Sequence, residues 1–343
     1  MEKKKMSGKK KAVIILAVVL GICVLFVGIA YAVLHHYHSK SNYVKDDQVQ
    51  TIDEDQLSDE DKNDVSNSMT EEEQKQAEEE AQKAQAEIVI PNGSDVYNIL
   101  LIGSDRRDTS WYGNSDVMML VSINKNTEKI YVTSFMRDSY ALVEGYGAHK
   151  LNFAYAIGGG PKLVETIEKN YRISIDNYAA GDFSSTATII DMVGGVDITV
   201  NDGEAELINK NTIGDHETLP GAGTYHLNGN QAVAYGRIRY VGNADYERTE
   251  RQRRVVEQIF NKAKNLSISE LNDLANEILP LITHNISEGD TLSLLTSLPT
   301  IMGYDMELGR IPYDGMFSSK GEMLVPDWEA TITKLHNTIY AES

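Results

Sequence analysis

The sequence predicts an α/β domain with a mixed central sheet and helices on both faces, preceded by a single transmembrane helix and an acidic linker. Segments typical of strands and helices alternate from about residue 91 onward, which favours an α/β architecture. Residues 12–34 carry no charge, whereas residues 43–88 hold sixteen acidic residues against four lysines. The chain therefore divides into an apolar segment, a highly charged segment and a globular region.

The uncharged run near the N-terminus predicts an uncleaved membrane anchor. Its 23 residues, at about 1.5 Å per residue, span roughly 35 Å against about 30 Å of hydrocarbon. Six lysines precede it within residues 1–11, and no comparable basic cluster comes just after it. This asymmetry places the basic tail in the cytoplasm and the C-terminal domain outside the cell membrane. The next residues, His35-His36-Tyr37-His38, offer no small-residue cleavage site of the kind that a signal peptide requires.

The acidic stretch is predicted to be a disordered spacer over residues 35–90. Its charge and its Gln, Ser and Ala content leave too little apolar surface for a core of its own. Residues 70–87 are rich in Glu, Ala and Gln, a composition that suits a partial helix. The globular domain is assigned to residues 91–343. We expect the spacer to provide distance from the membrane and nothing more.

Strands open the globular domain and helices follow. Apolar segments predict strands at residues 96–102, 117–123 and 130–135. The turn Asn124-Lys125-Asn126-Thr127 joins the last two, which predicts a hairpin. Helices are expected at 150–157, 161–171 and 183–192, and a strand at 196–200. The apolar helix face of Ile189, Ile190 and Val193 is expected to pack on the core.

The second half of the domain alternates in the same way. The apolar residues 232–235 predict a strand that continues to Arg237 and Arg239. Helices are expected at about 246–263 and 267–281, followed by a strand at 306–311 and a final helix at 326–340.

Six of the eleven arginines fall between residues 236 and 254, although the net charge of the chain is -19. Arg237 and Arg239 lie two apart on the predicted strand, so their side chains leave the same face. Asp245, Arg248 and Gln252 can line one face of the next helix. Because the planar guanidinium group suits phosphate oxygens, the window predicts a site for a dense anion.

A surface helix is the alternative interpretation of this window. Glu247 and Glu250 are available as ion-pair partners for the arginines of the helix, and exposed pairs of this kind are common. The additional pair of arginines on the predicted strand favours the anion site.

Two aspartates lie beside predicted strands. Asp105 follows the carboxyl end of the first strand, where open α/β sheets place their ligands, and Asp116 introduces the second strand. Two carboxylates next to an anion site suggest Mg²⁺, or else Mn²⁺, held together with substrate phosphate. Each aspartate taken alone is also an ordinary loop or capping residue. Arg137 follows the third strand and would join the same rim.

Taken together, these segments resemble the LytR-CpsA-Psr family of cell-wall polymer ligases. The resemblance covers about residues 95–265 and depends on the order and spacing of several separate motifs. The motifs are Asn98-Ile99-Leu100-Leu101-Ile102-Gly103-Ser104-Asp105, Ser115-Asp116, Arg137-Asp138, Lys150-Leu151-Asn152, Asp191-Met192-Val193-Gly194-Gly195-Val196-Asp197, Leu227-Asn228-Gly229-Asn230-Gln231-Ala232 and the arginine-rich window.

The resemblance implies a phosphotransfer reaction. A polyprenyl-pyrophosphate in the membrane carries a glycopolymer, and a peptidoglycan sugar hydroxyl attacks it, so that the polymer becomes attached through a phosphodiester. Asp105 and Asp116 are implied as Mg²⁺ ligands. The implied catalytic residues are Arg137, Arg237, Arg239 and Asp245. The implied pyrophosphate contacts are Arg137, Lys150, Arg237, Arg239, Arg248 and Gln252.

One position departs from the family pattern. The residue two before the second metal aspartate is often Arg in the family, and here it is Asn114. The departure implies that one phosphate contact is missing or is supplied from elsewhere in the chain.

Two other functions use nearly the same residues. A hydrolase would release the lipid pyrophosphate to water, and a non-enzymatic binder of lipid-linked polysaccharide would need the arginines but not the two aspartates. Nucleic acid is not an expected partner. Acidic residues exceed basic ones from residue 91 onward, and the chain contains no recognisable DNA-binding motif.

Overall fold

The computed structural model describes residues 35–57, 62, 69–105, 112–239, 241 and 244–342; within these ranges the side chains of Ala244, Asp245 and Ile268 are not described. The predicted membrane helix at 12–34 lies outside the described residues. Within the described ranges, no helix is both long and apolar enough to cross a membrane.

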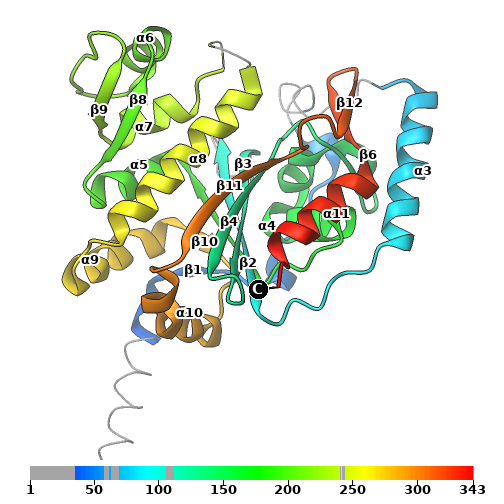
Figure 1. Cartoon of the computed structure of the whole chain (residues 1–343), viewed down its shortest axis with the longest axis horizontal. Coiled ribbons are helices and arrows are strands. Elements are labelled where there is room, and N and C mark those ends of the chain that lie inside the picture. Colours follow the sequence, from blue (N-terminus) through cyan, green and yellow to red (C-terminus); the bar gives the residue numbers. More distant parts are fainter. Residues whose placement is uncertain are drawn as a thin grey trace, which may run out of the picture.

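A seven-stranded mixed sheet in the order β1-β10-β7-β2-β3-β4-β11 forms the centre of the molecule (Figure 1). Strands β2, β3 and β4 are antiparallel neighbours, whereas β7 pairs parallel to β2 and β11 pairs parallel to β4. The bounds are β1 Asn42–Tyr43, β2 Val96–Asp105, β3 Asn114–Asn124, β4 Lys129–Phe135, β7 Asn177–Asp182, β10 Thr283–His284 and β11 Asp305–Ile311. The predicted strands at 96–102, 117–123, 130–135 and 306–311 and the predicted hairpin are confirmed.

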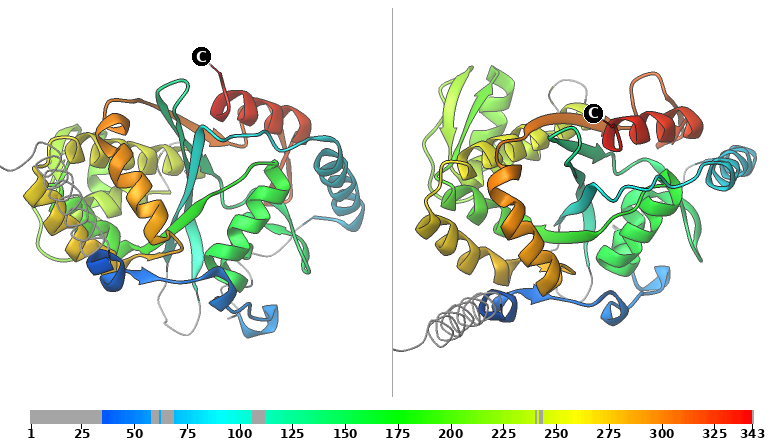
Figure 2. Two further views of the ribbon diagram at one scale, coloured as in Figure 1. Left: turned by 90° about the horizontal axis from the view of Figure 1, so that it is seen from below. Right: turned by 60° about the horizontal axis from the view of Figure 1, so that its bottom comes forward.

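Helices cover both faces of this sheet, as predicted (Figures 1 and 2). One face buries Leu100, Leu120 and Phe135 together with residues of α3, α4 and α11. The other face buries Met119, Val132 and their neighbours against α8 and α10. The helices are α3 Glu71–Glu87, α4 Leu151–Tyr171, α5 Phe183–Met192, α6 Asp202–Asn211, α7 Gly229–Gly236, α8 Ala244–Ala263, α9 Ile268–Ile278, α10 Glu288–Ile301 and α11 Trp328–Ile339.

Three two-stranded sheets complete the described fold. They pair β5 Tyr140–Val143 with β6 Gly147–Lys150, β8 Val196–Val200 with β9 Gly223–Leu227, and β12 Phe317–Lys320 with β13 Met323–Pro326. The β8–β9 pair, α6 and α7 share a separate apolar cluster that includes Tyr235 and Ile238. This cluster supports the segment that carries Arg237 and Arg239.

The prediction of a disordered spacer over 35–90 is wrong for the described part of that segment. Residues 42–43 form β1 and pair with β10, and α3 buries Ala77, Ala81 and Ala84 in the main core cluster. These three alanines recur at helical spacing and form a narrow apolar stripe. The stripe is too small to build an independent core, but it is sufficient to dock on an existing one.

The predicted strand at 232–235 is also wrong, because residues 229–236 form helix α7. The side chain of Asn228 accepts a hydrogen bond from the Gln231 backbone N–H, and the Gln231 side chain accepts one from the Asn228 backbone N–H. This capping box starts a helix. Arg237 is then the residue that ends the helix, and Arg239 follows in the next segment.

Candidate active site

Asp116 is the centre of a cluster of guanidinium groups. Its carboxylate lies 2.9 Å from Arg137 Nη1, 3.3 Å from Arg239 Nη2 and 3.9 Å from Arg248 Nη1. We call these four residues the Asp116 cluster. They come from β3, the loop after β4, the segment after α7 and helix α8, so the fold brings together predicted site residues that lie far apart in the sequence.

A β-bulge directs Asp116 toward this cluster. Gly103 pairs with Val117, but the next residue of β2, Ser104, pairs with Ser115. Asp116 is therefore the extra residue of the bulge, which turns its side chain out of the regular alternation. A valine Cβ lies 2.9 Å from where a Cβ on Gly103 would be, so the absence of a side chain at Gly103 permits this close approach of the two strands.

The arginines keep the Asp116 carboxylate ionised. Burial of the carboxyl group raises its pKa, but the charges of Arg248, Arg137 and Arg239 and the hydrogen bond from Arg137 outweigh burial and hold the pKa below its usual value. The cluster nevertheless carries three guanidinium charges against one carboxylate, and its charge stays positive when Asp138, 3.5 Å from Arg137 Nε, is included. This excess of positive charge in a partly buried position suits an anion such as a phosphate.

Asp105 and Arg237 extend the cluster along the end of the sheet. Arg237 Nη2 lies 3.7 Å from Asp105 Oδ2, and the Arg237 guanidinium is 4.2 Å from the centre of the Phe183 ring. The Arg237 side chain remains 47% exposed, so it is accessible to a ligand. Arg237 thus reaches Asp105 and Arg239 reaches Asp116, although a helix rather than a strand precedes them.

Helix α8 contributes a buried arginine and a hydrogen-bonding glutamine to the site. Arg248 is buried beside Asp116, and Gln252 Nε2 donates a hydrogen bond to the Gly236 carbonyl at 3.2 Å. Glu247 and Glu250 pair instead with Arg251 and Arg254. The surface ion-pair interpretation therefore accounts for only part of the arginine-rich window.

Arg251 has a role that the sequence did not reveal. It is 1% exposed, and its guanidinium donates to Glu204 Oε1 at 2.7 Å, to the Ile238 carbonyl at 3.1 Å and to the Val241 carbonyl at 3.0 Å. These bonds tie α6 and α8 to the segment that contains Arg239. Arg251 therefore positions the arginine-bearing segment and is not available to bind a ligand itself.

Lys150 lies in an adjoining ion-pair network. Its Nζ is 3.2 Å from Asp138 Oδ1 and 3.3 Å from Glu322 Oε2, and Asp138 also approaches Arg137 Nε at 3.5 Å. The structure therefore connects Lys150 to Arg137 through Asp138. The side chain of the predicted catalytic residue Asp245 is not among the described ones.

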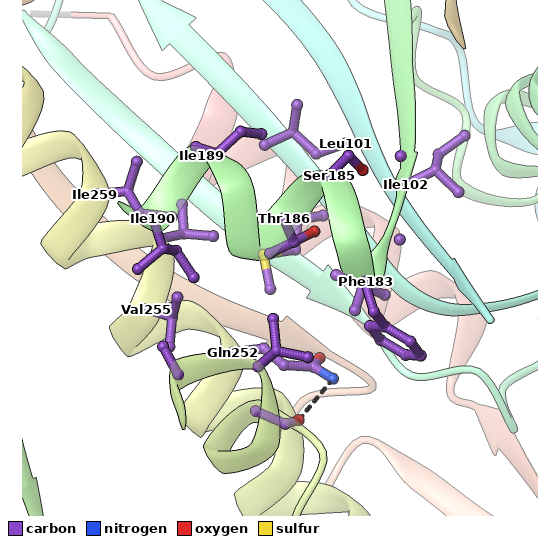
Figure 3. A pocket seen from close by; sticks show the side chains of 18 of the residues that line it. Leu101, Ile102, Phe183, Ser185, Thr186, Ile189, Ile190, Gln252, Val255 and Ile259 are labelled. Carbon is purple, nitrogen blue, oxygen red and sulfur yellow. Dashed lines mark hydrogen bonds between the residues drawn. The ribbon is translucent and has the colours of Figure 1, made fainter. Parts of the chain in front are cut away.

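An apolar cavity of about 270 Å³ opens beside the arginines. Figure 3 shows Ile189 and Ile190 of α5 opposite Val255 and Ile259 of α8. Arg237 is the one charged side chain among the described lining residues. Ile190 is buried in an apolar cluster, as predicted for this helix face, and Ile189 and Ile190 also line the cavity. Small residues of the lining, among them Gly103, Ala179, Gly181 and Ala232, leave this space between the sheet and the helices.

The two aspartates are suitable ligands for a hard divalent cation. Asp105 and Asp116 lie on neighbouring strands, and Mg²⁺ commonly binds one or two carboxylates together with substrate phosphates and water. Within the described ranges, no group of three or more His, Cys, Asp and Glu side chains gathers as a ready-made metal site. The donor set thus fits an ion that arrives with a phosphate ligand, and it does not form a closed protein cage.

Comparisons with known proteins agree with the geometry. A model of the LytR_cpsA_psr family matches residues 61–338. Polyisoprenyl-teichoic acid–peptidoglycan teichoic acid transferase TagU of Oceanobacillus iheyensis is 37% identical over 213 residues, 60% of this chain and 62% of that protein. The corresponding transferase TagT of Bacillus subtilis is 31% identical over 235 residues, 64% of this chain and 72% of that protein. The chain thus spans less than two thirds of the length of the Oceanobacillus protein.

A solved structure shares the fold. The structure of TagT bound to LIIa-WTA superposes with a TM-score of 0.59 at 25% identity, and the match covers 75% of this chain and 96% of that one.

Proposed function

Because the chain belongs to the LytR_cpsA_psr family, we propose that it is a phosphotransferase that attaches a glycopolymer to peptidoglycan. The donor is the glycopolymer linked to a polyprenyl pyrophosphate, and the acceptor is a peptidoglycan sugar hydroxyl. The observation that carries this proposal is the apolar cavity that ends at Arg237 and Gln252, beside the Asp116 cluster. Such a site suits a ligand with an apolar chain and an anionic head.

Each part of the donor has a matching part of the site. The prenyl chain would occupy the cavity between α5 and α8, whose lining is almost entirely apolar, because burial removes its hydrocarbon from water. The pyrophosphate would lie at Arg237, Arg239 and Arg248, where bidentate guanidinium groups can bind its oxygens. Teichoic acid is named as the polymer transferred by the two relatives, and we propose an anionic cell-wall polymer of that class here.

The reaction follows from this placement. The acceptor hydroxyl oxygen attacks the phosphorus that carries the polymer, the bond from that phosphorus to the bridging oxygen breaks, and polyprenyl phosphate leaves. The hydroxyl proton must pass to a base near the attacking oxygen. Arg137, Arg239 and Arg248 lie within 3.9 Å of Asp116, where they would neutralise charge on the phosphate oxygens in the transition state. Positioning and charge neutralisation supply most of the catalysis in phosphoryl transfer.

We also propose that Asp105 and Asp116 hold Mg²⁺, or Mn²⁺, together with phosphate oxygens of the donor. The bound ion would add positive charge at the pyrophosphate. Arg137, Arg239 and Arg248, which contact Asp116 here, would then turn from the carboxylate to the phosphate oxygens.

The proposed location is the cell membrane. Residues 12–34 would form the single span, with the basic tail in the cytoplasm and the catalytic domain outside. Strand β1 is the edge strand of the sheet and pairs with β10. Since β1 begins only a few residues after the proposed span, the domain would lie close to the membrane that holds the lipid donor. Ile282, next to β10, lines the apolar cavity, which places this edge of the sheet beside the proposed prenyl site.

The direct test is a transfer assay with the full chain in lipid vesicles. A polyprenyl-pyrophosphate-linked glycopolymer and peptidoglycan are supplied, and mass spectrometry identifies the products. We expect a phosphodiester-linked polymer on the glycan, lost in Arg239→Ala and retained in Arg254→Ala, since Arg254 is 46% exposed and bonds to Glu250 and the Tyr235 hydroxyl rather than to Asp116. Polymer released only to water would identify a hydrolase, and binding of the donor without any product would identify a non-enzymatic binder.

A further inference from the structure

A second cavity, of about 400 Å³, lies over the edge strand β11. It is lined by Tyr131 and Thr133 of β4, by residues 307–310 of β11, by Arg253 of α8, by Tyr313 and Asp314, and by Lys334 and Thr338 of α11. We call it the β11 cavity. Figure 1 shows β11 crossing the front of the molecule between α8 and α11. The Asp116 cluster contributes no side chain to the described lining.

Arg253 is a buried cation that the fold leaves without a hydrogen-bond partner at one nitrogen. The residue is 7% exposed, and Nη1 has no hydrogen-bond partner within the described part of the chain. Burial lowers the pKa of its guanidinium to about 10, so the group stays charged at neutral pH. A buried donor without an acceptor is costly, and a bound anion would remove that cost.

The other charges around the cavity also favour an anion. Glu307 pairs with Lys129, and Asp314 pairs with Arg310, so both carboxylates of the lining are already neutralised. Lys334 has no carboxylate partner among the described residues; its Nζ lies 4.3 Å from the centre of the Tyr313 ring. Arg253 and Lys334 are therefore the two cations of the lining that form no ion pair within the described part of the chain.

The uncharged lining is of mixed character. Tyr313 supplies aromatic surface beside Lys334, and the Thr338 hydroxyl supplies a hydrogen-bonding group, whereas Tyr131 and Thr133 are only 5% and 3% exposed and form the floor of the cavity. A flat aromatic face beside a few fixed polar groups suits a ligand that is partly apolar and rich in hydroxyls. A sugar ring has both properties.

The β11 cavity is close to the proposed reaction centre. Thr133 lies near the end of β4 and precedes Arg137 by four residues, so their Cα atoms are at most about 14 Å apart. The Met136 backbone N–H also donates to the Ile311 carbonyl at 2.9 Å, which fixes the end of β11 beside the segment that carries Arg137. A glycan that reacts at the Asp116 cluster can therefore extend into the cavity.

We propose that the β11 cavity binds an anionic sugar unit, one that bears a carboxylate or a phosphate, of a glycan substrate. Arg253 and Lys334 bind the anionic group, and Tyr313 contacts the sugar ring. The assignment of this sugar to a substrate rests on the proposed function. The binding itself is measurable without turnover, so a failure of the transfer assay and a failure of this proposal can be told apart.

The test compares three sugars that share the same type of ring but differ in the charge of a substituent. N-acetylmuramic acid carries a carboxylate, N-acetylglucosamine 6-phosphate carries a phosphate, and N-acetylglucosamine is neutral. Binding to the full chain in detergent micelles is followed by ligand-observed NMR titration. We expect at least one anionic sugar to bind roughly tenfold or more tightly than the neutral one. A preference for the carboxylate or for the phosphate that is kept in Arg239→Ala and lost in Arg253→Gln assigns that charged group to the β11 cavity; a preference that is lost only in Arg239→Ala places the sugar at the Asp116 cluster and overturns the proposal.

Variants locate the binding. Arg253→Gln and Lys334→Gln should each weaken binding of the anionic sugar by about ten- to a hundredfold. Because Lys334 is exposed, its variant tests the cavity even if Arg253→Gln lowers stability. Arg254→Gln on the same helix, and Arg239→Ala in the Asp116 cluster, should leave this affinity within about twofold. Equal binding of all three sugars, or unchanged affinity in both cavity variants, would overturn the proposal.

Gly309 allows an independent test that changes no charge. A Cβ at Gly309 would meet only Thr133 Oγ1, at 3.9 Å, within the described residues, so Gly309→Leu places a side chain in the cavity without a backbone clash. This variant should lose the anionic sugar while its unfolding temperature stays near that of the unmodified chain. Retained binding in a folded Gly309→Leu protein would place the sugar elsewhere.

Discussion

Removal of the Asp116 carboxylate should destabilise the protein and should be partly reversed by an anion. In Asp116→Ala, Arg137, Arg239 and Arg248 lose the acidic group that lies within 3.9 Å of each of them. The three positive charges then repel one another in a site that is largely shielded from water. We propose that the same excess of positive charge binds the pyrophosphate of the donor.

The expected loss of folding stability in Asp116→Ala follows from the burial of each ion pair. Arg137 is 10% exposed and Asp116 12%, so their pair behaves as a buried one, whose disruption costs about 3–5 kcal/mol. Arg248 is more buried but more distant, at 3.9 Å. Arg239 is 36% exposed, and solvent screening leaves its contribution at about 1 kcal/mol or less. We expect a loss of about 3 kcal/mol, or roughly 6–12 °C in unfolding temperature for a domain of this size.

The pH dependence has a defined sign. Since the pKa of Asp116 is held below its usual value, the carboxylate stabilises the folded state at all pH values above about 4. That stability is lost as the pH falls through the lowered pKa. The stability difference between the unmodified chain and Asp116→Asn should therefore be constant from about pH 5 to 8 and should shrink below about pH 4.

Urea and thermal unfolding measure these differences, with and without inorganic pyrophosphate. Pyrophosphate should raise the unfolding temperature of Asp116→Ala more than that of the unmodified chain, because it supplies the missing negative charge. Asp197→Ala is a matched control, since Asp197 is 47% exposed where it pairs with Lys262, and it should cost less than about 1 kcal/mol. A cost for Asp116→Ala as small as that of the control would refute the reasoning.

Three further outcomes are expected. Ala81→Glu places a charge where α3 docks on the core and should lower the free energy of unfolding in urea by about 1–3 kcal/mol. Ala86→Glu, at an exposed position of the same helix, should change it very little. Equal effects of the two variants would mean that α3 is not docked. Arg251→Ala removes the buried pair with Glu204 and should lower the free energy of unfolding by about 3–5 kcal/mol and abolish most of the transfer activity. Arg254→Ala should lower the free energy of unfolding by less than about 1 kcal/mol. A fully active and stable Arg251→Ala protein would contradict the positioning role of Arg251. Transfer should stop in EDTA and return with Mg²⁺ or Mn²⁺, and Asp105→Ala should not recover; full turnover in EDTA would exclude the metal role.

Local sequence patterns were sufficient for most of the central sheet. Strands β2, β3 and β4 carry apolar runs bounded by turn residues, and the Asn124 side chain accepts bonds from the Asn126 and Thr127 backbones at the predicted hairpin. The strand predicted at 232–235 failed because the apolar run was considered without its cap. Asn228 and Gln231 form a capping box, a signal that was present in the sequence and that outweighs a short apolar run.

The site was predictable where charge density alone identifies it. Asp116, Arg137 and Arg239 meet as expected from strand ends and arginine spacing. The role of Arg251 was not predictable, because its partners Glu204 and the Ile238 carbonyl are brought to it only by the tertiary fold. The apolar cavity was hidden for a similar reason. A helix face that lines a cavity and one that fills a core have the same periodicity, and the difference lies in small residues contributed by other elements.

Calorimetric binding of a polyprenyl pyrophosphate tests the central claim most directly. We expect Arg237→Ala, Arg239→Ala and Arg248→Ala each to weaken binding by about ten- to a hundredfold, which corresponds to the loss of one charge-assisted contact of about 1.5–3 kcal/mol. Arg254→Ala should change the affinity by less than about threefold, and inorganic pyrophosphate should bind far more weakly than the lipid because it leaves the apolar cavity empty. Equal small losses at all four arginines would contradict a defined pyrophosphate site beside an apolar cavity.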